Sequence, residues 1–225
     1  MERHTPLVTG ETYHIYNRGA HKNTVFTCED DYKRFLLLLF LCNASGPVNM
    51  REIRTKYKGR SFADVFKYEK REKSLVSILA YSLMPNHFHL VLQQVADAGV
   101  TTFMKKVSTG YSMYFNTKYE HSGVLLQGRF KSSHIDNESY FRYIFSYVHL
   151  NPVELIEKDW EKKGVQDPAR VRDALNNYRY SSFFDYSIGE REEGVILDKT
   201  QIPDFLVTQN DLEDMLQSYT KDRPL

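Results

Sequence analysis

The chain has 225 residues, enough for one well-buried domain with at most a small appendage, and this length argues against two full domains. Its two cysteines have no CxxC spacing, which excludes a zinc ribbon and a disulfide scaffold, and its longest apolar run, residues 35–42, is far shorter than a membrane span. The net charge of +1 gives no general sign of nucleic-acid binding. Because residues 1–10 lack the apolar segment of a secretory signal, we expect a cytoplasmic protein with one active site and no membrane partner.

The charge is unevenly distributed along the chain. Residues 51–73 contain nine basic residues against four acidic ones, whereas acidic residues predominate from Asp185 onward. A basic middle and an acidic tail suit a body that binds a polyanion and a tail that avoids it. A solvated insertion and a solvated tail explain the same pattern equally well.

Hydrophobic periodicity and turn residues predict an α+β domain with elements in the order β-α-β-β-α-β-α. This order indicates a ferredoxin-like sandwich, an antiparallel or mixed sheet with helices packed on one face. The basic segment 46–73 interrupts the order as a surface insertion. The predicted elements are a strand at 12–17, a helix at 29–43, a short helix at 62–68, a hairpin of strands at 75–83 and 87–93, a helix at 101–119, a strand at 132–135 and a helix at 138–150.

His87 and His89 form the first candidate constellation. They lie one residue apart on a predicted strand, so both imidazoles leave the same face while Phe88 points into the opposite layer. Two neutral imidazoles side by side can provide half of a divalent metal site. Paired strand histidines are also common as surface or core residues, so the pair alone does not establish a site.

Tyr147 and Asn151 form the second constellation. They lie four residues apart before Pro152 and therefore share one face of the last predicted helix. A phenol beside an oxygen ligand, facing two histidines, is what tyrosine-based phosphodiester cleavage needs. From spacing alone, packing is the better explanation for Tyr147, which is one of 16 tyrosines, and Tyr140 and Tyr143 lie on similar faces.

Six short segments of the chain match the motifs of a known protein family in the same order. Together they resemble the motifs of the REP-associated tyrosine transposases, which are domesticated relatives of the single-tyrosine insertion-sequence transposases. The resemblance covers about residues 12–182, with interruptions at 46–72 and 156–177. The segments are YHIYNRG (13–19), LMPNHFHLVL (83–92), YFNTKY (114–119), GVLLQGRFKSSHID (123–136), YVHLNPV (147–153) and YRYSS (178–182).

The resemblance implies an HUH endonuclease fold and a role for each constellation. His87 and His89 would bind the catalytic metal, Asn151 would supply its third ligand, and Tyr147 would be the nucleophile that forms a 5′-phosphotyrosine intermediate. Phe88 fits the bulky middle position of the HUH motif only loosely. The implied ion is Mg²⁺ or Mn²⁺, although two imidazoles favour Mn²⁺ or Zn²⁺ over Mg²⁺, so its identity stays open.

The same resemblance implies a substrate, namely single-stranded DNA hairpins of palindromic repeats, nicked and rejoined by a nucleoid-associated monomer or homodimer. We divide the chain into a transposase domain at 1–185 and an acidic extension at 186–225 that we expect to be dispensable for nicking. Three alternatives are a mobile insertion-sequence transposase, a plasmid relaxase, which usually shows a third histidine, and a catalytically silent regulator that binds hairpin DNA. The candidate DNA contacts are Arg18, Lys105, Lys106, Arg129 and Lys131.

Overall fold

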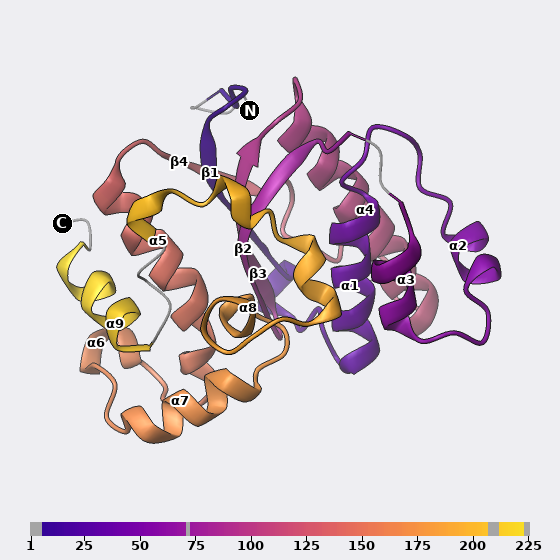
Figure 1. Ribbon diagram of the computed structural model, residues 1–225. Coiled ribbons are helices and arrows are strands. Elements are labelled where there is room, and N and C mark those ends of the chain that lie inside the picture. The colour runs from indigo at the N-terminus through magenta and orange to yellow at the C-terminus, as the bar shows by residue number, and fades with distance from the viewer. Residues whose placement is uncertain (1–5, 71–72, 207–211, 223–225) are drawn as a thin grey trace.

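A four-stranded sheet lies at the centre of the molecule (Figure 1). The computed structural model describes residues 6–70, 73–206 and 212–222. In these residues the strand order is β2-β3-β1-β4, and every neighbouring pair is antiparallel. The predicted strands are confirmed, with Pro85 and Asn86 forming the turn of the β2–β3 hairpin. The strands are β1 (Thr12–Arg18), β2 (Val76–Met84), β3 (His87–Gln94) and β4 (Lys131–Ile135).

The predicted helices are confirmed as α1, α3, α4 and α5, and α2 is an additional helix within the predicted insertion. None of the helices within the described ranges is long and apolar enough to cross a membrane. Short 3-10 segments are η1 (Ala20–Lys22), η2 (Asn151–Leu155), η3 (Glu192–Ile196), η4 (Lys199–Gln201) and η5 (Asp204–Leu206). The α-helices are α1 (Glu29–Leu41), α2 (Met50–Lys56), α3 (Phe62–Tyr68), α4 (Gly99–Tyr119), α5 (Glu138–Leu150), α6 (Trp160–Lys163), α7 (Pro168–Asn177), α8 (Phe183–Ser187) and α9 (Leu212–Lys221).

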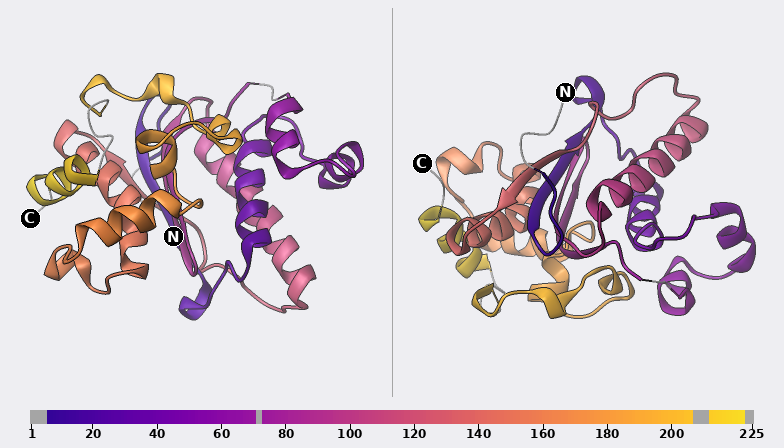
Figure 2. Two further views of the ribbon diagram at one scale, coloured as in Figure 1. Left: turned by 60° about the horizontal axis from the view of Figure 1, so that its bottom comes forward. Right: turned by 90° about the horizontal axis from the view of Figure 1, so that it is seen from above.

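Helices cover both faces of the sheet, so the expectation that they pack on one face was wrong (Figure 2). Side chains alternate along β3: Leu90 and Leu92 join the cluster of α1 and α4, whereas Val91 points to the other face and joins the cluster of α5. A sheet with two apolar faces must bury both of them. The α5 face is the one that also carries His87 and His89.

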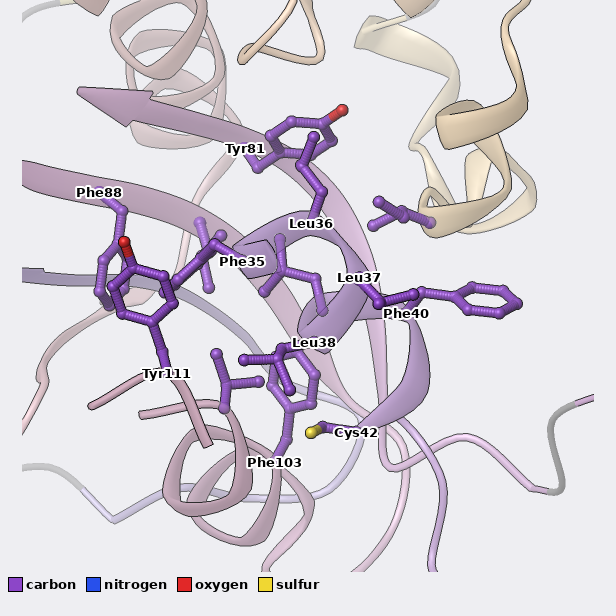
Figure 3. Close-up of a cluster of buried hydrophobic side chains, with 14 of the residues drawn as sticks. Phe35, Leu36, Leu37, Leu38, Phe40, Cys42, Tyr81, Phe88, Phe103 and Tyr111 are labelled. Atoms are coloured by element: carbon purple, nitrogen blue, oxygen red, sulfur yellow. The ribbon is translucent and has the colours of Figure 1, made fainter. Parts of the chain in front are cut away.

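The apolar run at 35–42 lies in α1 and at its C-terminal end, and it forms the core of the first face (Figure 3). Phe35 is fully buried, and its ring lies 5.0 Å from that of Phe88 on β3. Phe88 therefore points into the layer opposite the two histidines, as the alternation along the strand predicts. Its packing anchors the backbone of β3 between His87 and His89.

The described part of the acidic extension packs against α5. Leu212, Met215 and Tyr219 of α9 are buried in the same cluster as Phe145, which is fully buried on α5 (Figure 1). The spacing of these α9 residues gives the helix one apolar face. Instead of an appendage beside the domain, α9 is part of the layer that carries Tyr147.

Met215→Ala is therefore expected to destabilise the protein by about 2–5 kcal/mol, because it leaves a cavity where a side chain is now fully buried. Urea denaturation measures the difference, and exposed Gln217→Ala on the same helix is the matched control. Equal stability of the two variants would contradict the packing of α9 on α5. It would restore the expectation that the acidic extension is dispensable.

Candidate active site

The pairing of β1 with β3 brings the ends of two strands together on the α5 face. Arg18 lies directly opposite His87, and Tyr16 lies opposite His89, so these four side chains share one face of the sheet. They border a pocket of about 270 Å³. The lining residues are Tyr16, Asn17, Arg18, His87, His89, Gln127, Lys131 and Tyr147.

Gly19 keeps the end of β1 close to the β2–β3 turn. Its backbone N–H donates to the carbonyl oxygen of Asn86 at 2.8 Å. A Cβ atom at this position would lie 2.0 Å from the carbonyl oxygen of Asn23, so only glycine allows the chain to pass here. The close approach fixes Arg18 beside His87 at the mouth of the pocket.

His87 joins the sheet to the end of α5. Its Nδ1 lies 2.6 Å from Oδ1 of Asn86, and its Nε2 lies 3.1 Å from Oδ1 of Asn151. Burial lowers the pKa of His87, and a neutral imidazole has one proton to donate. When Nδ1 carries that proton and donates it to Asn86, the lone pair of Nε2 faces the Asn151 oxygen. The 3.1 Å between Nε2 and this oxygen is close to the separation of two ligands that bind one ion with bonds of about 2.1 Å. The donor set fits a divalent cation.

His14 on β1 is a site residue that sequence reasoning missed. Its Nε2 lies 2.8 Å from Nδ1 of His89, and both side chains are buried. When His89 donates through Nδ1, its Nε2 keeps a lone pair for a metal, and the hydrogen bond fixes the orientation of the ring. The signal was the alternation of His14, Tyr16 and Arg18 along the strand, which becomes informative only once β1 is known to lie beside β3.

The histidines of the pocket are uncharged at neutral pH. Burial lowers the pKa of His14 to about 4. Burial, reinforced by the neighbouring His14 and His87, lowers the pKa of His89 well below its usual value. Metal binding requires neutral imidazole, so His87 and His89 are ready to act as ligands without first losing a proton.

Tyr147 faces this cluster from α5. Its ring lies 5.2 Å from the ring of His89, and Phe145 and Val148 on the same helix are fully buried. Among the tyrosines of α5, Tyr147 alone lines the pocket, whereas Tyr143 stacks on Tyr147 at 6.2 Å and on Tyr219 of α9 at 5.2 Å. The structure therefore brings Tyr147, and not its neighbours, to the two histidines.

The phenol of Tyr147 is held in its protonated form. Burial is the main cause, assisted by the nearby charge of Glu161, and together they raise its pKa above the ordinary value. The hydrogen bond with Asn151 acts in the opposite direction. Any reaction of this phenol with a phosphate needs positive charge nearby to stabilise the oxygen as it loses its proton.

The predicted DNA contacts separate into two groups. Arg18 and Lys131 line the pocket, and Arg129 is exposed on the loop before β4, outside the lining. Lys105 and Lys106 lie on α4, on the other face of the sheet. Lys106 donates through Nζ to the backbone oxygens at positions 44 and 46, 2.6 Å in each case, and so fixes the start of the predicted insertion.

Tyr16, Asn17 and Gln127 were not predicted but line the pocket. They belong to the segments YHIYNRG and GVLLQGRF, so the signal was their position beside the predicted Arg18 and Arg129. Within the described ranges, no group of three or more His, Cys, Asp or Glu side chains can hold a metal ion. A metal in this pocket would therefore need the amide oxygen of Asn151 in addition to the histidines.

Comparison with known proteins agrees with the family and the fold that the sequence predicts. Residues 47–151 match the family model described as Transposase IS200 like, a range that includes His87, His89, Tyr147 and Asn151 and begins within the predicted insertion. A solved REP-associated tyrosine transposase, bound to a REP hairpin, is 14% identical, with 83% of this chain and 84% of that chain covered and a TM-score of 0.50. This likeness confirms the α+β fold of the HUH type.

A second solved structure has a weaker likeness. The tRNA(His) guanylyltransferase from Saccharomyces cerevisiae is 11% identical, with 91% of this chain and 86% of that chain covered, but the TM-score of 0.31 supports no argument. Comparison with curated proteins gives no significant match.

Proposed function

We propose that this chain is a transposase of the IS200-like family, whose model matches residues 47–151, and that it nicks and rejoins single-stranded DNA with Tyr147 as the nucleophile. The observation that carries the proposal is that Tyr147 lines one pocket with His87 and His89, while Asn151 contacts His87 beside it. Each residue type has a distinct task there. The phenol attacks, and the two imidazoles and the amide oxygen hold a divalent cation.

The reaction begins when Oη of Tyr147 attacks the phosphorus of a DNA phosphodiester. A new bond joins the phenol oxygen to the 5′ phosphate of the fragment on the 3′ side of the nick, and the bond from phosphorus to the 3′ oxygen of the other fragment breaks. The phenol loses its proton, and the leaving 3′ oxygen gains one and becomes a hydroxyl. A free 3′ hydroxyl can reverse these changes and rejoin strands without a nucleotide cofactor. Nicking and strand transfer are therefore the two directions of one reaction.

A divalent cation at His87, His89 and Asn151, when bound, supplies positive charge to the phosphate oxygens. His14 orients His89 from behind, and Asn86 orients His87 in the same way. These partners fix both rings before the substrate arrives. Two imidazoles favour Mn²⁺ over Mg²⁺, and their neutral state leaves a nitrogen lone pair on each ring free for the ion.

The pocket suits an unpaired strand. Tyr16 presents an aromatic ring beside Lys131, whose Nζ lies 6.0 Å from the ring centroid, and Arg18 adds a second positive charge at the strand end. A ring on which a base stacks and flanking cations for the backbone are the usual elements of single-strand recognition. We propose hairpins of palindromic repeats as the source of that strand, in line with the hairpin bound by the solved transposase.

The test uses hairpins taken from the DNA that flanks the gene, labelled on the 3′ side of the nick. We expect the labelled fragment to remain attached to protein after denaturation in the presence of Mg²⁺ or Mn²⁺, while the 5′-side fragment runs free with a hydroxyl end. A nick without an adduct would show that water attacks instead. No nick on any hairpin, with binding retained, would indicate a regulator that has lost the reaction.

A further inference from the structure

A second basic surface is lined by residues of α1, α2 and α3 and of the turn before α3. These helices lie on the other side of the sheet from α5 (Figure 1). The surface is a groove of about 730 Å³. No acidic residue in the described ranges lines it. The five cations that line this groove are Arg34, Arg51, Arg54, Lys58 and Arg60.

The cations of this groove lie together without carboxylate partners among the described residues. Among the described residues, none of the five forms an ion pair, whereas neighbouring Lys56 pairs with Glu69 at 2.6 Å. Arg34 stacks over the ring of Tyr114 at 4.7 Å instead. A concentration of unpaired positive charge costs free energy through mutual repulsion, and a bound anion would remove that cost.

Arg34 differs from the other cations of the groove because its side chain is partly buried. The residue lies on α1, and burial together with the nearby Arg54 lowers its pKa. A guanidinium that is half removed from water gains more from an anion than a fully exposed one does. The groove therefore has an inner cation on α1 and an outer row along α2 and the turn that follows.

The shape of the groove favours successive phosphates over a single small anion. Its cations extend from α1 across α2 to the start of α3, and the volume far exceeds that of one phosphate group. Its aromatic residues are occupied by the protein: Tyr57 is buried, and Phe62 packs edge-to-face on Phe66 at 4.9 Å. With no free ring on which a base can stack, the groove suits the outside of a duplex and not an unpaired strand.

We propose that this groove binds the phosphate backbone of a DNA duplex, the paired stem of the hairpin substrate. The inference rests on the proposed function, since that function supplies a substrate with a stem. It assigns the single strand to the pocket beside Tyr147 and the double strand to the groove of α1, α2 and α3. The basic segment predicted as an insertion is then a substrate-binding element.

The test replaces three exposed cations of the groove in one variant, Arg51→Gln, Arg54→Gln and Lys58→Gln. Affinity is measured by fluorescence anisotropy for a hairpin with a stem of about 12 base pairs and for an unstructured strand of equal length, at several salt concentrations. We expect at least about tenfold weaker hairpin binding and a salt slope smaller by about 2–3, because each lost phosphate contact removes about 0.9 from it. Binding of the unstructured strand should change less than twofold.

A control variant removes three exposed cations of α6 and α7, Lys162→Gln, Lys163→Gln and Arg170→Gln, and should leave the hairpin slope unchanged. The inference is overturned if the groove variant keeps the wild-type hairpin affinity and slope, or if it loses hairpin and single-strand binding equally. Nicking of the unstructured strand by the groove variant reports separately on the pocket. Failure of nicking in the wild type would contradict the proposed function and leave the binding comparison valid.

Discussion

Tyr147→Phe is expected to abolish the covalent protein–DNA adduct, to below about one part in 10³ of the wild type, while folding and hairpin affinity persist. The substitution removes one oxygen and keeps the ring that packs beside His89 and Tyr143. Affinity depends on cations and stacking, which the change leaves in place. Denaturing electrophoresis of a hairpin labelled on the 3′ side of the nick measures the adduct, and a thermal melt checks folding.

Tyr143→Phe is the matched control for this variant. Its ring stacks on those of Tyr147 and Tyr219 and does not line the pocket, so the variant should form the adduct at the wild-type level. Tyr140→Phe should do the same. Peptide mapping of the adduct to Tyr140 or Tyr143, or an adduct that survives in Tyr147→Phe, would identify a different nucleophile and contradict the proposed function.

Local periodicity predicted most of the candidate site. Spacing of two on a strand placed His87 and His89 on one face, and spacing of four on a helix placed Tyr147 above Asn151. Both relations depend only on neighbours in the sequence, and in the structure Tyr147 lines the same pocket as the two histidines while Asn151 contacts His87. The assignment of roles to these residues came from the family resemblance, because periodicity shows which residues share a face but not which reaction they perform.

The features that sequence reasoning missed depend on contacts between distant segments. His14 meets His89 across the pairing of β1 with β3, and no local pattern fixes which strands become neighbours. Lys106 was predicted to contact DNA, yet it donates to backbone oxygens of the segment that follows α1. Both cases turn on partners more than 50 residues away, because the contacts join positions separated by 75, 62 and 60 residues.

The prediction for the acidic tail rested on its composition. Its negative charges suggested a segment that avoids the ligand, but Leu212, Met215 and Tyr219 give α9 an apolar face at helical spacing. This helical spacing of apolar residues was present in the sequence, but the prediction gave more weight to the acidic composition. Because α9 packs on the helix that carries Tyr147, burial of that apolar face determines the position of the tail, and its charge does not.

His87→Ala and His89→Ala are each expected to abolish nicking while hairpin affinity stays within about tenfold of the wild type. Each variant removes one imidazole from a three-ligand set that contains no carboxylate. Calorimetry with Mn²⁺ measures the loss of the ion directly, without reference to activity. A variant that nicks normally and binds Mn²⁺ as the wild type does would remove that residue from the site.

His14→Phe separates the ligands from the residue that orients them. The ring keeps its volume between Tyr16 and His89, where His14 stacks at 4.9 and 5.0 Å, but it loses the 2.8 Å hydrogen bond to His89. We therefore expect Mn²⁺ affinity to fall by about 10- to 100-fold and nicking to recover at high Mn²⁺, which the His89→Ala variant should not do. Equal, irreversible loss in both variants would instead make His14 a ligand, and an unchanged Mn²⁺ affinity in His14→Phe would mean that packing alone orients His89.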